Sequence, residues 1–95
     1  MQVLRYERFG EPVDVVASGE APMPEPGPGE VRLRTLRSPI HNHDLATIRG
    51  VYGVKPTLPA VGGTEVLGGV DAVGEGVPFA SGTRIATMLP GGWAQ

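Results

Sequence analysis

The residues best suited to metal chemistry are the two histidines of the segment HNHD at positions 41–44. His41 and His43 are two positions apart, and Asp44 follows directly. On a strand, residues i and i+2 share a face, so a His-x-His pair can chelate a metal ion. The chain has no third histidine and no cysteine that would complete a zinc site. The alternative is that His43 is exposed on a first helical turn and that His41 is half-buried in a packing or hydrogen-bonding role.

A second candidate is Tyr52, which lies in the irregular segment IRGVYGVKPTLPAVGGTE (48–65). A phenol is protonated at neutral pH and can act as a general acid. A tyrosine in such a segment can equally serve as a packing lid. The residues alone leave both roles open.

Other catalytic patterns are missing. None of the serines at positions 18, 38 and 81 lies in a G-x-S-x-G elbow. The glycine-rich runs GGTEVLGG and GEGVPFASG are not followed by a helical pattern. These glycines therefore predict turns or bulges and not a phosphate-binding loop.

Length and composition restrict the class of protein. A chain of 95 residues fits one small domain, and its net charge of −2 argues against a nucleic-acid partner. No apolar run approaches the roughly 20 residues of a membrane span, and the N-terminus lacks the pattern of a signal peptide. We therefore expect a soluble cytoplasmic protein with no membrane partner. Its 15 glycines and 10 prolines favour short strands joined by tight turns over a mainly helical fold.

The elements that must position these side chains follow from local patterns. We expect a hairpin of strands 2–6 and 13–18, a proline-stiffened connector at 19–30, and strands at 30–38, 65–77 and 83–89. Gly68 and Gly69 indicate a bulge or the close approach of another backbone. One short helix is expected over 42–49, with Asn42 as its N-cap and Gly50 as its terminator.

Several motifs together resemble one known family. PGPGEVRLR (26–34), SPIHNHDLATIRGVYG (38–53) and LPAVGGTEVLGGVDAVG (58–74) are similar to the N-terminal catalytic domain of the medium-chain dehydrogenase/reductase superfamily. The resemblance covers nearly the whole chain. It implies that residues 1–95 form a mainly β, GroES-like domain of the alcohol dehydrogenase type, a partly open β-barrel with one short helix.

Within this superfamily, the resemblance points to the zinc-independent branches. Zinc alcohol dehydrogenases carry a cysteine before the helix and a Gly-His-Glu motif later; His41 occupies the first position and Gly63-Thr64-Glu65 the second. A threonine hydroxyl does not belong to the usual zinc ligands. We therefore expect no catalytic zinc, and an oxidoreductase similar to quinone oxidoreductases and 2-enoyl thioester reductases.

The segment RGVYG is most similar to the enoyl thioester reductases, in which this tyrosine is the proposed proton donor. The resemblance thus assigns Tyr52 as the catalytic acid in an NADPH-dependent reduction of a C=C bond. Those reductases usually carry Asn-Pro where this chain has His41 and Asn42. Together with Thr64, these two residues are the expected cofactor-side residues. The alternatives are a quinone oxidoreductase lobe and a non-enzymatic GroES-like binding or assembly module.

The resemblance also implies a division of labour between two domains. These enzymes bind NADPH mainly on a Rossmann domain that follows in the chain, and no strand–Gly-rich loop–helix fingerprint occurs among the 95 residues. We therefore expect the chain to be inactive by itself and to need a cofactor domain or a partner chain. The expected substrate is a small enoyl thioester or quinone, and a homo-oligomer is compatible with the resemblance.

Overall fold

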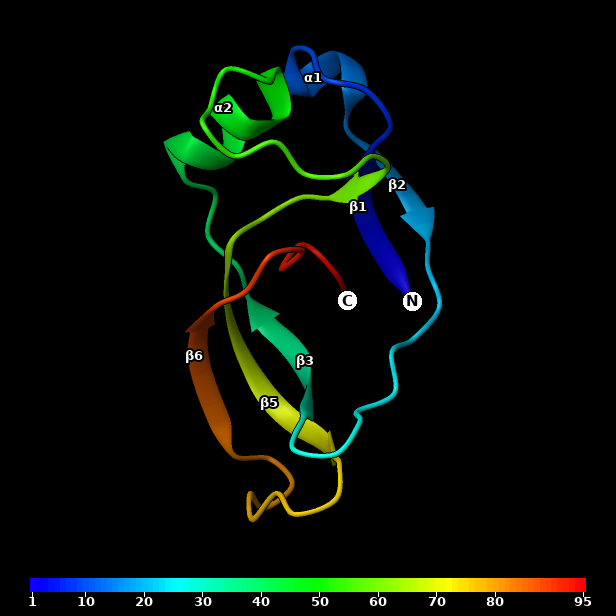
Figure 1. Ribbon diagram of the computed structural model, residues 1–95, viewed down its shortest axis with the longest axis vertical. Coiled ribbons are helices and arrows are strands. Elements are labelled where there is room, and N and C mark those ends of the chain that lie inside the picture. Colours follow the sequence, from blue (N-terminus) through cyan, green and yellow to red (C-terminus); the bar gives the residue numbers. More distant parts are fainter.

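Two three-stranded antiparallel sheets and two short helices make up the computed structural model, which describes all residues, 1–95 (Figure 1). The first sheet has the order β2-β1-β4, with β1 at Gln2–Tyr6, β2 at Ala17–Glu20 and β4 at Ala60–Val61. The second has the order β3-β5-β6, with β3 at Val31–Arg37, β5 at Glu65–Val73 and β6 at Arg84–Met88. The helices are α1, Pro12–Val15, and α2, Asn42–Arg49. Neither helix has the length and apolar character that crossing a membrane requires.

The N-terminal hairpin is present, but its second arm differs from the expectation. The predicted strand at 13–18 is wrong in its first half, because Pro12–Val15 forms the single helical turn α1, with proline at the start of the helix. Proline is favoured there because it has no N–H to leave unpaired. Strand β2 begins only at Ala17 and continues through Glu20, pairing with β1 and using residues that were expected to belong to the connector.

The second sheet contains the three strands that were predicted, but β5 ends at Val73, so the predicted strand 65–77 is wrong over 74–77, where the chain turns. Strand β3 pairs with β5 along its whole length, with register shifts near Leu33 and Leu36. A Cβ atom on Gly68 would lie 3.1 Å from the backbone oxygen of Arg34 and 2.8 Å from the Cβ of Leu33, so the predicted close approach of another backbone is confirmed there. At Gly69 an added Cβ would meet nothing within 4 Å. Strand β4 was not predicted, because two residues carry no readable pattern.

Helix α2 has the predicted boundaries and a different N-cap. It spans Asn42–Arg49 and ends at Gly50, whose φ of 76° is in the left-handed region. The N-cap is His41, not Asn42 as predicted, and the His41 amide donates to the Asp44 carboxylate. The acidic side chain three residues into the helix therefore fixes its first turn.

A small core joins α2 to the first sheet. Tyr6, Ile48 and Ala60 are buried together, with Trp93 packed against them. Trp93 arrives from the C-terminal segment, which returns to β1 through the pairing of Val3 with Ala94. The core therefore lies at the end of the molecule that carries both helices (Figure 1).

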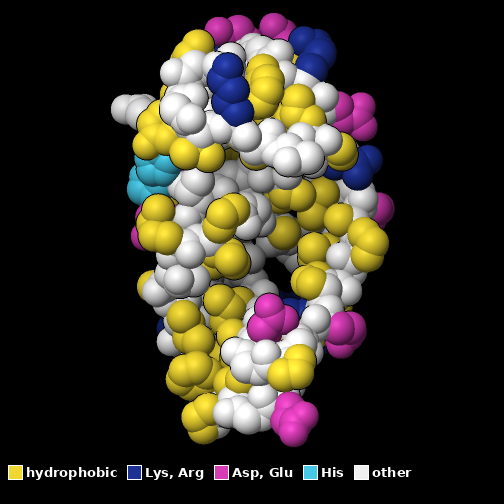
Figure 2. Space-filling view, viewed as in Figure 1, with side chains coloured by type: hydrophobic (Ala, Val, Ile, Leu, Met, Phe, Trp, Pro, Cys, Tyr) yellow, Lys and Arg dark blue, Asp and Glu magenta, His cyan; other side chains and the backbone are white.

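The two sheets do not close on each other. A cavity of about 900 Å³ lies between the second sheet, the connector before β3 and the C-terminal segment. Its lining includes the apolar side chains of Val31, Leu33, Val66 and Ile85 beside the charged side chains of Arg32 and Arg34. The hollow and its apolar lining are visible beside the second sheet in Figure 2. An open arrangement of antiparallel strands with short helices confirms the predicted GroES-like, partly open fold, with α1 as an additional helix.

Candidate functional site

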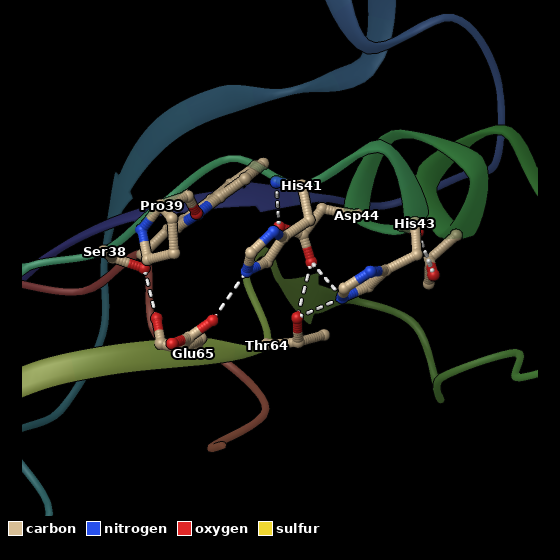
Figure 3. A network of polar contacts seen from close by, with 9 residues as sticks. Ser38, Pro39, His41, His43, Asp44, Thr64 and Glu65 are labelled. Atoms are coloured by element: carbon tan, nitrogen blue, oxygen red, sulfur yellow. Dashed lines mark hydrogen bonds and ion pairs between the residues drawn. The ribbon is translucent and has the colours of Figure 1, made fainter. Parts of the chain in front are cut away.

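Two of the predicted site residues, His41 and Thr64, belong to a polar cluster that lies where the first turn of α2 faces the beginning of β5. His41, His43 and Asp44 come from the helix side, and Thr64 and Glu65 from the strand side (Figure 3). The bonded pairs of the two groups are 20 to 24 residues apart in the chain. Their meeting therefore depends on how the loop after α2 leads into β4 and β5 (Figure 1).

Asp44 is the buried centre of this polar cluster. Its side chain is only 1% exposed. The His41 amide donates to Oδ2 over 2.9 Å, and the Thr64 hydroxyl donates to Oδ1 over 2.8 Å. A buried carboxylate is tolerated only when its oxygens have such partners. Burial raises the pKa of Tyr6, and the negative charge of Asp44 raises it further.

The two histidines point to different partners. Nε2 of His41 lies 2.6 Å from Oε2 of Glu65, and Nε2 of His43 lies 2.7 Å from the Thr64 hydroxyl (Figure 3). Their rings stack with centroids 4.8 Å apart and planes 18° apart. The side chains are 36% and 33% exposed, so both are half-buried, and the expectation that His43 is exposed is wrong.

This geometry bears on the hypothesis of a His-x-His metal site. No group of three or more His, Cys, Asp or Glu side chains is arranged to hold a metal ion. The Nε2 atoms of His41 and His43 are each hydrogen-bonded to a separate side chain. Thr64 uses its hydroxyl within the cluster, where it bonds to both His43 and Asp44. The absence of catalytic zinc remains a prediction.

Tyr52 lies at the exposed border of the cluster. It follows α2 in an irregular segment, is 44% exposed, and its ring centroid is 5.9 Å from that of His43. The structure thus brings a solvent-accessible phenol next to an imidazole that a buried carboxylate orients through Thr64. A phenol and an imidazole placed in this way can hold and move protons. If Tyr52 served only for packing, we would expect its ring to be enclosed by neighbouring side chains.

The predicted cofactor-side residues differ in whether their side chains already form hydrogen bonds. Asn42 is exposed, and its amide makes no hydrogen bond within the chain. His41 and Thr64, in contrast, are already engaged with Glu65 and Asp44. The sequence reasoning missed these two carboxylates as partners. The only available signal was that Glu65 directly follows the Thr64 position and that Asp44 follows the histidines.

The family of this chain follows from a match over most of its length. The sequence profile of the alcohol dehydrogenase GroES-like domain matches residues 27–94. The chain belongs to this family, within the medium-chain dehydrogenase/reductase superfamily.

Within this family, the chain is similar to enoyl reductases and quinone oxidoreductases. The chain is 37% identical over 90 residues to the mitochondrial enoyl-[acyl-carrier-protein] reductase of Xenopus tropicalis, covering 95% of this chain and 23% of the relative. A mycobacterial quinone oxidoreductase matches 98% of this chain and 29% of its own, with a TM-score of 0.80 and 30% identity. The structure of the Etr1p/NADP/crotonyl-CoA complex matches 95% of this chain and 28% of the Etr1p chain, with a TM-score of 0.74 and 31% identity.

These relatives are much longer than the chain, which spans about a quarter of the length of the curated proteins it matches. Enoyl reductases and quinone oxidoreductases are thus both represented among its homologues. Several of the enoyl reductases are named as mitochondrial, whereas the sequence analysis predicts a cytoplasmic protein. The compartment remains a prediction.

Proposed function

We propose that this chain is the catalytic part of an NADPH-dependent reductase that reduces the C=C bond of an enoyl thioester. The observation that carries the proposal is the juxtaposition of Tyr52, a half-exposed phenol, with the oriented ring of His43. The names of the relatives support it, since one is an enoyl-[acyl-carrier-protein] reductase and another is a complex with NADP and crotonyl-CoA.

Tyr52 is the general acid in this proposal. A bound NADPH would supply the hydride that Cβ of the enoyl thioester receives, and the substrate would then be an enolate. The Tyr52 O–H bond then breaks, its proton forms the new C–H bond at Cα, and the phenol becomes a phenolate. Val51 and Val54, which flank Tyr52, are 76% and 65% exposed and offer apolar surface to the acyl chain.

The cofactor-side residues have unequal roles. Asn42 has a free, exposed amide that can both donate and accept hydrogen bonds, which suits the carboxamide of a nicotinamide. His41 and Thr64 are held by Glu65 and Asp44, so we assign them to shaping the site beneath the cofactor. The pyrophosphate of the cofactor is held by a separate cofactor-binding domain or partner chain, because dinucleotides bind at a Gly-rich turn into a helix.

The reaction is proposed to need no zinc. By the family resemblance, His41 and Thr64 occupy the positions of zinc ligands, and Glu65 is the neighbour of Thr64. All three side chains form hydrogen bonds within the protein. A threonine hydroxyl that already donates to Asp44 is a poor substitute for an imidazole ligand.

A quinone is the second candidate substrate. The similarity to the mycobacterial quinone oxidoreductase, with a TM-score of 0.80, favours it. The segment around Tyr52 favours the thioester, because reduction of a C=C bond requires a positioned acid for the carbon that receives the proton.

The test uses the complete reductase, by which we mean this chain joined to the cofactor-binding domain proposed above. NADPH consumption is measured with a crotonyl thioester and with a quinone, and the 95-residue chain alone serves as the control. We expect a higher kcat/KM for the thioester and no consumption by the chain alone. Turnover of the quinone only would replace the first substrate by the second, and turnover of neither would refute both.

A further inference from the structure

A chain of three side chains runs from the buried interior to the border of the site. The carboxylate of Asp44 can only accept hydrogen bonds. The single hydroxyl proton of Thr64 is donated to Asp44 Oδ1 over 2.8 Å. The hydroxyl oxygen of Thr64 can therefore only accept from His43, whose Nε2 lies 2.7 Å away. The arrangement requires that Nε2 of His43 carries a proton.

This fixed tautomer leaves Nδ1 as the nitrogen of His43 that can gain or lose a proton. Asp44 Oδ1 lies 3.7 Å from Nε2 and provides the counter-charge when the ring is an imidazolium. The side chain of His43 is 33% exposed, so the ring can exchange protons with water. Its ring centroid is 5.9 Å from that of Tyr52.

The neighbouring histidine braces this ring. His41 stacks on His43 with planes 18° apart, and its own Nε2 is held by Glu65 over 2.6 Å. Stacking on His41 thus sets the plane of the His43 ring, and the hydrogen bond to Thr64 sets the direction in which Nε2 points. A side chain whose plane and tautomer are both fixed is prepared for directed proton transfer, since little reorganisation remains.

We propose that His43 returns the proton to Tyr52 after each reduction, a step that rests on the function proposed above. The phenolate left on Tyr52 takes the proton from Nδ1 of His43, so that an O–H bond forms and an N–H bond breaks. The imidazolium becomes neutral imidazole with its proton on Nε2, and water then restores the proton at Nδ1. The two rings are adjacent without a hydrogen bond, and such bonds commonly tighten when substrate is bound.

The first test is kinetic and uses the complete reductase with a crotonyl thioester. His43→Ala is expected to lower kcat by about 10²-fold, the lower end of what a positioned acid or base contributes. Added imidazole should restore kcat in proportion to its concentration, because it supplies the missing proton carrier in the vacated space. Arg49→Gln, on the exposed end of α2, is the control and should keep the original kcat. Unchanged kcat in His43→Ala, or a loss that imidazole does not restore in a folded variant, would overturn the proposal.

The second test reads the ring directly. Nitrogen NMR of the imidazole side chains should show neutral His43 with its proton on Nε2. Thr64→Val should abolish this preference, and Thr64→Ser should restore it. A neutral ring protonated on Nδ1 would contradict the inference whatever the kinetics. If the complete reductase turns over but His43→Ala is normal, only this inference fails; if it does not turn over any thioester, the proposed function fails as well.

Discussion

Thr64 and Asp44 are joined by a 2.8 Å hydrogen bond that connects the residue before β5 to the first turn of α2. The bond satisfies a carboxylate that is 1% exposed and, through the second lone pair of the hydroxyl, orients His43. One short polar side chain thus serves both the stability of the fold and the geometry of the site.

Thr64→Val is expected to lower the free energy of unfolding by about 1–3 kcal/mol, because it leaves a buried carboxylate oxygen without a partner. Thr57→Val is the matched control, since Thr57 is exposed and makes no side-chain hydrogen bond, and its effect should stay within about 0.5 kcal/mol. Chemical denaturation of both variants measures the difference. Equal stabilities for the two variants would show that the Thr64–Asp44 bond does not stabilise the fold.

Tyr52→Phe is expected to lower kcat of the complete reductase by about 10²–10⁴-fold while cofactor and substrate binding change little, because the ring remains and only the acidic proton is lost. Tyr52→Ala removes the ring as well and should weaken substrate binding in addition. Steady-state kinetics with a crotonyl thioester separates the two effects. A normal kcat in Tyr52→Phe would mean that the phenol acts only as a surface of contact.

Alkaline pH should destabilise the protein through Tyr6, which is 3% exposed and close to Asp44. Burial, with a smaller contribution from Asp44, raises the pKa of Tyr6 in the folded state above that of a tyrosine in the unfolded chain. The resulting stabilisation is fully present below the unfolded pKa and is lost as pH rises through the folded pKa. Thermal unfolding of Tyr6→Phe should therefore match the original protein at neutral pH and lose less stability above about pH 10. Parallel curves for the two proteins would contradict this assignment.

Gly63→Ala should destabilise the fold by about 1–3 kcal/mol, for two separate reasons. Gly63 has a φ of 92°, which disfavours a side chain, and an added Cβ would lie 2.5 Å from Cδ1 of Trp93. Gly76→Ala is the control, because Gly76 also has a positive φ, of 82°, but nothing lies within 4 Å of the added atom. Denaturation of both variants isolates the contribution of Trp93. If they lose equal stability, the packing of Trp93 on this turn contributes nothing.

Elemental analysis after mild chelation should find no stoichiometric zinc. The expectation depends on Thr64, whose hydroxyl donates to Asp44 and is not a zinc ligand, and on the lack of cysteine. Any weakly held metal at the histidine pair should be removed by chelator and disappear in His41→Gln. One tightly bound zinc per chain would overturn the prediction.

Elements with local signals could be predicted from the order of the residues alone. Helix α2 has the predicted boundaries because Asp44 in its first turn and Gly50 after its last both act within a few residues of the helix end. Strand β3 follows its own alternation of side chains, and the family motifs indicate the open β-fold that the sheet order confirms.

Contacts between residues that are far apart in the chain could not be predicted in this way and became visible only in the folded protein. Strand β4 exists because Ala60 and Val61 pair with β1, more than 50 residues earlier in the chain, and α1 replaced an expected strand in the loop that precedes β2. The partners of the two histidines, Glu65 and Thr64, are likewise brought to them by the path of the chain into β5. Hydrogen bonds between such residues depend on the packing of whole elements, so the pattern of side chains in one segment cannot specify them.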